Sequence, residues 1–230
     1  MSHATIEITD GIAVITMNDG KANAFGFDMM TALNDCFDEA EAQADVIVLT
    51  AIGGAMCAGF DLKVMRNEPD RAGEMVAMGG KLMTRIFGND KPVIIASPGH
   101  GIAAGGLLML AADYRIGAEG DARYGLNESA IGMVLPPFGL DLAVFKLNNK
   151  YLDMCFAGAE LIDPATAVKA GFLDETVAAD KLMARAMEKA QEMQKLDGKA
   201  YAGNKRLIRG PVTDKMAGDL EGVSNLSVAP

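Results

Sequence analysis

The sequence predicts an α/β fold, because segments with the features of strands and of helices alternate along its 230 residues. Two short, continuously apolar segments resemble buried strands, "DVIVLTA" (45–51) and "KPVIIAS" (91–97), and each leads into a loop marked by glycine. Hydrophobic residues make up 50% of the chain, which is enough for one sizeable core, since single domains commonly reach about 200 residues.

The N-terminal elements are predicted from simpler patterns. "TIEITDGIAVITMNDG" (5–20) alternates apolar and polar residues around Asp10-Gly11, which predicts a β-hairpin. Apolar residues then recur at intervals of three and four, which predicts a helix with one apolar face. That face is formed by Met30, Leu33, Phe37 and Ala40.

The later elements follow the same alternation. Helices are expected over about 72–87 and after the glycine and alanine cluster near 103–106, and "ARYG" (122–125) predicts another strand. Asp163-Pro164 is typical of a helix start and Gly171 of a helix end. From residue 178 the pattern is helical and more charged. We therefore expect a core domain over 1–177 and a helical region over 178–230.

Charge and cysteine content exclude several classes of protein. The formal net charge is −10 and no basic run occurs, so no nucleic-acid partner is expected. The three cysteines are widely spaced and odd in number, which favours reduced thiols over a disulfide framework or a metal site. Without a leader-like N-terminus or about 18 continuous apolar residues, the sequence predicts a cytoplasmic protein with no membrane partner.

The segment "GIAAGGLLMLAADYRI" (101–116) begins a predicted helix with very small side chains. Backbone N–H groups in the first turn of a helix lack internal partners, and the helix dipole favours negative charge there. A substrate carbonyl that gains negative charge during a reaction could bind to them, and the "CAGFD" loop, with Ala58 and Gly59, is a candidate for a second donor. The alternative is that the glycines only permit close packing of helix and sheet.

Four segments together resemble the crotonase family, also called the enoyl-CoA hydratase/isomerase family. "VIVLTAIGGAMCAGFDL" and "KPVIIASPGHGIAAGGLLMLAADYRI" resemble its two signatures, and "GKANAFGFDMM" and "AVKAGFLDETV" also fit, so the likeness covers about residues 5–178. It implies a spiral core of ββα turns and a C-terminal helical region that packs in a homotrimer or a dimer of trimers. The implied substrate is an acyl-CoA thioester, held with its carbonyl between two backbone N–H groups, and no cofactor other than this coenzyme A is implied.

Carried over by position, the two N–H donors are Ala58 and Ala104, the second being a departure from the glycine usual in the family. The hydratases of the family use two glutamates. In this sequence the position of the first glutamate is occupied by Leu107, which cannot transfer a proton, and the position of the second is occupied by Glu128 in "GLNE". The resemblance is strongest to the 3,2-enoyl-CoA isomerase branch, in which a single glutamate moves a double bond from the 3 to the 2 position.

Other residues are expected around this centre. The candidates for substrate binding are Gly59, Phe60, Asp61, Gly105, Leu107, Met133, Leu135 and Phe138. Of these, Asp61 is expected mainly to fix its loop, and the last three fit plain core packing equally well. Coenzyme A phosphates could meet Lys21, Lys205 or Arg206, whereas His100 and Cys57 are expected to have packing roles.

Hydration, thioester hydrolysis, other chemistry of this family and a non-catalytic acyl-CoA-binding subunit remain alternatives to isomerisation, since a fold does not fix a reaction.

Overall fold

The computed structural model describes residues 3–223, and its main element is a sheet of six strands. The first two strands form the predicted antiparallel hairpin, and Asp10 and Gly11 at its turn both have positive φ angles. The other neighbouring pairs are parallel. In spatial order the strands are β1 (Ala4–Thr9), β2 (Ile12–Met17), β3 (Val46–Ala51), β5 (Val93–Ser97), β7 (Tyr114–Ala118) and β9 (Glu175–Val177).

A second, smaller parallel sheet contains β4 (Ala55–Cys57), β6 (His100–Ile102) and β8 (Tyr124–Gly125). Each of its strands follows directly after a strand of the large sheet: β4 after β3, β6 after β5, and β8 after β7. The chain therefore winds through successive turns of two strands and a helical segment, as the ββα spiral requires. The segment around β4 was predicted to be a loop; a strand of three residues is too short to show a period in the sequence.

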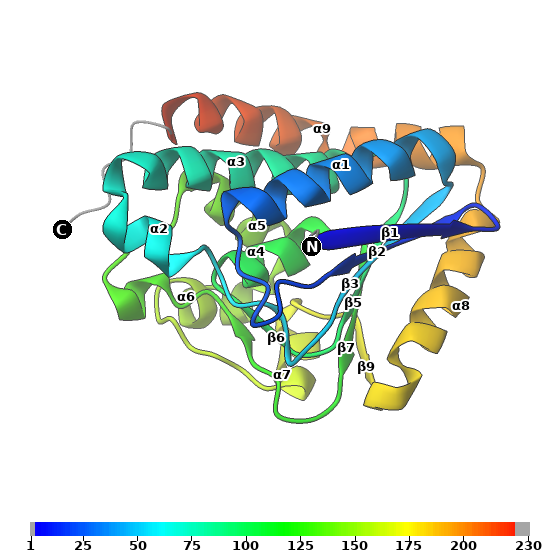
Figure 1. Ribbon diagram of the computed structural model, residues 1–230. Coiled ribbons are helices and arrows are strands. Elements are labelled where there is room, and N and C mark those ends of the chain that lie inside the picture. Colours follow the sequence, from blue (N-terminus) through cyan, green and yellow to red (C-terminus); the bar gives the residue numbers. More distant parts are fainter. Residues whose placement is uncertain (1–2, 224–230) are drawn as a thin grey trace.

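Helices cover both faces of the large sheet, so its central strands are apolar on both sides. Three long helices, α1 (Phe27–Gln43), α3 (Pro69–Gly88) and α9 (Gly198–Val223), lie side by side above the sheet in Figure 1. On the other face, α8 (Leu182–Gln194) packs Leu182, Ala186 and Ala190 against the strands. The region after 178 thus contains the 3-10 helix η2 (Ala179–Lys181), α8 and α9 in its described part.

Shorter helices complete the layer beside the small sheet. They are α2 (Leu62–Asn67), α4 (Ala104–Ala111), the 3-10 helix η1 (Glu128–Ile131), α5 (Pro137–Lys146), α6 (Asn149–Phe156) and α7 (Pro164–Ala170). The predicted bounds of α7 are confirmed: the Asp163 side chain accepts a hydrogen bond from the Thr166 N–H, and Gly171 ends the helix at φ +100°.

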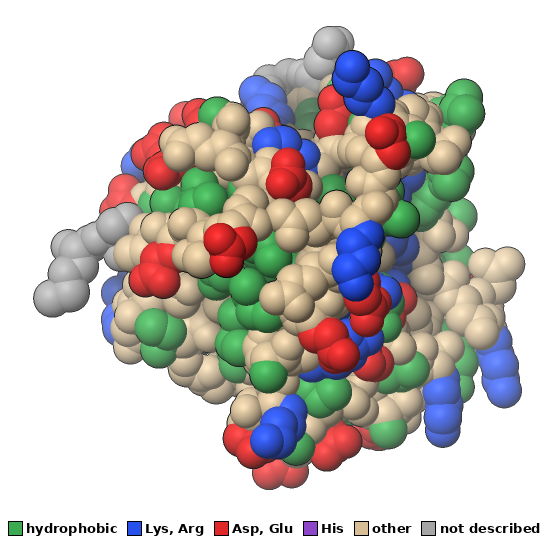
Figure 2. Space-filling view, turned by 90° about the vertical axis from the view of Figure 1, so that its right-hand side faces the viewer, with side chains coloured by type: hydrophobic (Ala, Val, Ile, Leu, Met, Phe, Trp, Pro, Cys, Tyr) green, Lys and Arg blue, Asp and Glu red, His purple; other side chains and the backbone are tan. Residues whose placement is uncertain are grey.

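The surface shows mixed charge. On the face drawn in Figure 2, basic and acidic side chains are interspersed with apolar ones. Within residues 3–223, no helix is long and apolar enough to cross a membrane. The three cysteines are free and buried, so in this conformation they form no disulfide framework.

Candidate active site

A cavity of about 400 Å³ lies where the 58–60 loop, α2, α3 and the segment 127–136 meet. Its walls are mostly apolar. They are formed by Ala58, Gly59, Phe60, Leu62, Met65, Gly73, Val76, Ala103, Leu107, Asn127, Glu128, Ile131, Gly132, Met133, Val134 and Pro136. Of the residues that line it, Glu128 alone carries a carboxylic acid.

The two glycine-marked loops meet at this cavity. A Cβ atom at Gly105 would lie 1.9 Å from the Cys57 carbonyl oxygen, so only glycine lets α4 approach the 57–60 loop this closely. At Gly106 a Cβ would lie 2.7 Å from the Gly125 carbonyl oxygen. These two glycines therefore serve close packing, the alternative interpretation, and Gly105 does not line the cavity as predicted.

The first amide of α4 is free to bind a ligand. The Ala103 carbonyl accepts a hydrogen bond from the Leu107 N–H (3.0 Å) and so points along the helix. In a trans peptide the adjoining N–H points the opposite way, which directs the Ala104 N–H out of the helix end. No acceptor for it is found within residues 3–223. Ala103 reaches this conformation with φ +54°, a strained value for alanine.

The prediction that Ala58 supplies the second donor needs correction. Its N–H donates to the Ala22 carbonyl (3.1 Å) and is therefore occupied. The free amide lies two residues further on. The Gly59 carbonyl accepts from the Phe25 N–H (2.8 Å), so the trans peptide directs the Phe60 N–H away from Phe25. Phe60 lines the cavity, and its N–H has no partner in the described part of the chain.

Glu128 enters the cavity from the first position of η1. The residue is 7% exposed, and its Oε2 atom has no hydrogen-bond partner in the structure as described. Burial away from water disfavours the charged form and raises the pKa of this carboxyl to about 7. Leu107, at the position of the missing first glutamate, is also buried and lines the same cavity.

The remaining predicted substrate residues divide into two groups. Gly59, Phe60, Leu107 and Met133 line the cavity. Leu135 and Phe138 do not: Phe138 is fully buried against α3 at Gly80, and Leu135 is partly buried and packs against the core beside Gly139. For these two, the core-packing alternative is correct.

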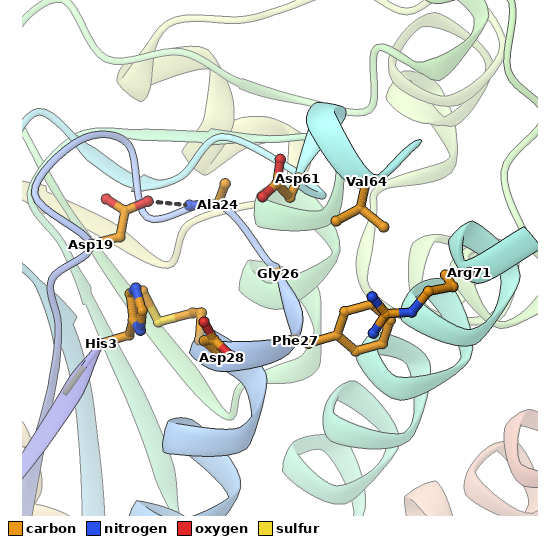
Figure 3. A pocket seen from close by; sticks show the side chains of 10 residues that line it. His3, Asp19, Ala24, Gly26, Phe27, Asp28, Asp61, Val64 and Arg71 are labelled. Atoms are coloured by element: carbon orange, nitrogen blue, oxygen red, sulfur yellow. Dashed lines mark hydrogen bonds between the residues drawn. The ribbon is translucent and has the colours of Figure 1, made fainter. Parts of the chain in front are cut away.

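Asp61 also lies outside this cavity. It caps α2 by accepting a hydrogen bond from the Lys63 N–H (2.8 Å), in agreement with its expected structural role. Its side chain faces a second cavity of about 310 Å³, shown in Figure 3, between the starts of α1 and α2. There the Arg71 guanidinium covers the Phe27 ring at 4.4 Å, and Asp19 accepts from the Ala24 N–H.

The predicted contact between Lys205 and coenzyme A is not supported. Lys205 is buried on α9, and its ammonium pairs with Asp113 at 2.7 Å. Arg206 forms an exposed pair with Asp90. Lys21 is exposed on the loop next to Ala22, so its phosphate contact stays a prediction.

The packing roles expected for His100 and Cys57 agree with the structure. The Nδ1 atom of His100 accepts from the Arg123 N–H (3.0 Å). Complete burial raises the pKa of the Cys57 thiol to about 12, which leaves it unreactive.

Comparisons with known proteins identify the family of the chain. A family model described as "Enoyl-CoA hydratase/isomerase" matches residues 7–226. The chain is 26% identical over 213 residues to mouse mitochondrial enoyl-CoA delta isomerase 1, covering 90% of this chain and 73% of that protein. It is 30% identical over 203 residues to the carnitinyl-CoA dehydratase of Salmonella typhi, covering 86% and 77%.

A solved structure of an enoyl-CoA hydratase/isomerase family protein from Pseudomonas syringae is 34% identical. It superposes with a TM-score of 0.95 over 98% of each chain. The matching family model spans nearly the whole sequence. The chain belongs to the enoyl-CoA hydratase/isomerase family.

Proposed function

We propose that this enzyme moves the double bond of an enoyl-CoA thioester from the 3 to the 2 position. One observation carries the proposal: the described cavity holds one carboxylic acid, Glu128, and the unpartnered Phe60 amide, and the unpartnered Ala104 amide directly follows Ala103, which also lines the cavity. The family resemblance supports acyl-CoA as the substrate class, and the mouse relative bears the name of an isomerase.

In the proposed reaction, the thioester carbonyl accepts hydrogen bonds from the Phe60 and Ala104 N–H groups. Glu128 removes a proton from C2, and the electrons of that C–H bond delocalise into the carbonyl to give a dienolate. The two amides stabilise its negative oxygen, and such a donor typically lowers a barrier by about 3 to 4 kcal/mol. Glu128 then returns the proton to C4, which leaves the double bond between C2 and C3.

The environment of Glu128 suits both transfers. A base that must also act as an acid works best when its pKa is close to the working pH, and burial raises the pKa of Glu128 to about 7. Leu107 removes the second carboxylate that would hold and activate water in the hydratases. These steps require proton transfer only, so we propose no cofactor besides the coenzyme A of the substrate.

Hydration is the second candidate, because the Salmonella relative is named a dehydratase. Purified protein is to be incubated separately with 3-hexenoyl-CoA and 2-hexenoyl-CoA, and the products separated by chromatography. We expect double-bond migration from the first substrate and little water addition to the second. Faster water addition to 2-hexenoyl-CoA would overturn the isomerase assignment.

The role of Glu128 is tested with Glu128→Gln, which keeps the shape of the side chain. Migration is expected to fall by about 10²–10⁴-fold, the usual contribution of a general base. Glu188→Gln, on the exposed side of α8, serves as the matched control and is expected to retain full activity. Unchanged migration in Glu128→Gln would contradict the proposal. Absence of any turnover, with saturated acyl-CoA still bound, would favour a non-catalytic binding subunit.

We further propose that the chain forms a homotrimer or a dimer of trimers, and that α9 contributes to the interface. Leu207 and Ile208 are 81% and 66% exposed on this helix, unusually high for two adjacent apolar side chains. Light scattering is expected to give three or six times the mass of the monomer. A monomer at micromolar concentration would overturn this proposal.

A further inference from the structure

Basic side chains outnumber acidic ones in a cluster at the C-terminal end of α4, the end away from the cavity. The members come from α5, α9, β7 and the segments that follow α4 and precede β9. They are the acids Asp113 and Asp174 and the bases Arg115, Lys146, Lys205 and Arg209.

Three of the four bases are paired with the two acids. Arg115 binds Asp174 through its Nε and Nη2 atoms, at 2.8 and 2.9 Å. Asp113 pairs with Lys205 at 2.7 Å and with Arg209 at 2.9 Å, each through a different oxygen. Every carboxylate oxygen of the cluster therefore already has a cationic partner.

Lys146 is the base without an acid. Its Nζ atom donates to the Ala112 carbonyl at 2.8 Å, and it forms no ion pair within residues 3–223. An ammonium group has three donors, so one acceptor satisfies it poorly. Arg209 donates to the adjacent Ala111 carbonyl at 3.5 Å, which places a second positive charge at the same helix end.

These surroundings favour a neutral amine at Lys146. Burial, together with the positive charges of Arg115 and Arg209, lowers its pKa to about 6, and the opposing effect of Asp113 and Asp174 is too small to offset this. At about pH 7.5 an ordinary lysine is neutral in roughly one molecule in a thousand. Lys146 is neutral in most molecules at that pH, and its side chain is only partly buried.

A neutral Lys146 leaves the cluster with three cations and two anions. A modification that suits this site therefore adds one negative charge and little bulk. Carbon dioxide reacts with a neutral amine in this way, because the nitrogen lone pair forms a bond to the carbon and the electrons of one C=O bond move to oxygen. One amine proton passes to solvent, and the product is a carbamate with a single negative charge.

We propose that Lys146 is a modification site that reversibly binds carbon dioxide as a carbamate, which balances the charge of the cluster. Arg115 uses three of its five N–H donors on Asp174 and the Gly171 carbonyl, so it retains donors for the new oxygens. An acyl group transferred from a thioester would give a neutral amide and leave the imbalance in place. The inference is independent of the proposed function, because the site lies at the other end of α4 from the free Ala104 amide.

The test is carbon NMR of the purified protein, equilibrated with isotope-labelled bicarbonate at about pH 7.5. We expect a carbamate resonance that disappears when carbon dioxide is purged and when the pH falls below about 6. Lys146→Met replaces the amine with an apolar side chain and is expected to lose this resonance. Lys150→Met, on the exposed side of α6, is the matched control and is expected to retain it.

Two further measurements keep the inference testable if Lys146→Met folds poorly. Alkylation converts a carbamate into a stable ester, and mass spectrometry of wild-type peptides is expected to locate this ester on Lys146. Bicarbonate is also expected to raise the Tm of the wild type by about 1 °C at half occupancy, relative to chloride at equal ionic strength.

The outcomes are distinct. A carbamate resonance that persists in a folded Lys146→Met variant would come from another amine and would overturn the inference. The absence of any carbamate in the wild type, or an acyl group on Lys146 in its place, would overturn it as well. None of these results bears on double-bond migration, which tests the proposed function separately.

Discussion

The two ends of α4 differ in how their polar groups are satisfied. At the cavity end, the Ala104 amide has no acceptor within the described chain, and small residues leave it open. At the other end, Lys146 donates to the Ala112 carbonyl at 2.8 Å, and Asp113 pairs with Lys205 and Arg209 at 2.7 and 2.9 Å. The N-terminal end of α4, with its free amide, is therefore held in place by the hydrogen bonds and ion pairs at the C-terminal end of the same helix.

The bonded end also connects distant parts of the chain. Lys205 and Arg209 belong to α9, and Asp113 additionally accepts from the Val93 N–H at the start of β5. The cluster therefore ties the C-terminal helix to the segment that forms the site. This explains why Lys205 is buried and unavailable to a phosphate.

Removal of one charge from this cluster should have the largest effect on stability. Asp113→Asn leaves Lys205 and Arg209 buried without their acid, which typically destabilises a protein by about 3 to 5 kcal/mol. Chemical denaturation measures the loss. Asp90→Asn breaks the exposed pair with Arg206 and serves as control, with an expected loss below about 1 kcal/mol. Equal losses would show that the buried cluster has no special role.

Removal of the free Ala104 N–H should lower the activity rather than the stability. Ala104→Pro removes the N–H at the first position of α4, where the fixed φ of proline is compatible with a helix. We expect kcat for migration to fall by about 10²–10³-fold, as for the loss of one oxyanion donor. Circular dichroism should show an unchanged helix content. Wild-type kcat in a folded variant would contradict the assignment of this amide.

The raised pKa of Glu128 predicts a pH-dependent stability. Below pH 4.5 the carboxyl is protonated in both states and carries no penalty. Between 4.5 and about 7 the unfolded chain loses the proton and the folded chain keeps it, so the free energy of unfolding falls as pH rises. Above about pH 7 the free energy of unfolding falls no further, and the total decrease due to Glu128 is on the order of 3 kcal/mol.

Denaturation of the wild type and of Glu128→Gln at pH 4 and at pH 8 measures this penalty. The variant should gain stability relative to the wild type only at the higher pH. A difference independent of pH would mean that Glu128 titrates as an ordinary exposed carboxyl.

A smaller effect is expected where the two loops touch. Gly59 has φ +110°, and an added Cβ would lie 3.1 Å from the Ala103 Cβ. Gly59→Ala should therefore lower both the stability, by about 1 to 3 kcal/mol, and the activity, because the Phe60 and Ala104 amides would be forced apart. Gly120 also has a positive φ, but an added Cβ there would meet no other atom, so Gly120→Ala serves as the control and should lower stability without lowering activity. Full activity in Gly59→Ala would show that the spacing of the loops is not critical.

Much of this arrangement could be predicted from the sequence, for identifiable physical reasons. Long apolar runs reveal buried strands, so β3 and β5 were located within two residues, and Asp163 and Gly171 mark the ends of α7 because capping is local chemistry. The role of Glu128 was suggested by the resemblance, and the structure adds its burial and its unpartnered oxygen.

The errors concern features that no local pattern encodes. The donor was assigned to Ala58 from its position in the family motif, whereas the availability of an amide depends on which way its peptide faces. That direction is set by Ala22 and Phe25, more than thirty residues earlier in the chain. Leu135 and Phe138 were assigned to the cavity, but apolar residues in a core and in a binding pocket look alike in a sequence. The charge imbalance around Lys146 likewise becomes visible only once every neighbour is placed.

The strained Ala103 has a consequence for the energetics of catalysis. Its positive φ is imposed during folding, where Leu107, the glycine contacts of α4 and the buried ions at Asp113 hold the backbone in place. In the proposed reaction, the amide dipoles that meet the thioester oxygen are therefore already oriented before the substrate arrives. Little of the substrate's binding energy is then needed to rearrange these dipoles. Water molecules would have to reorganise around the same negative charge, whereas the protein dipoles are fixed in place.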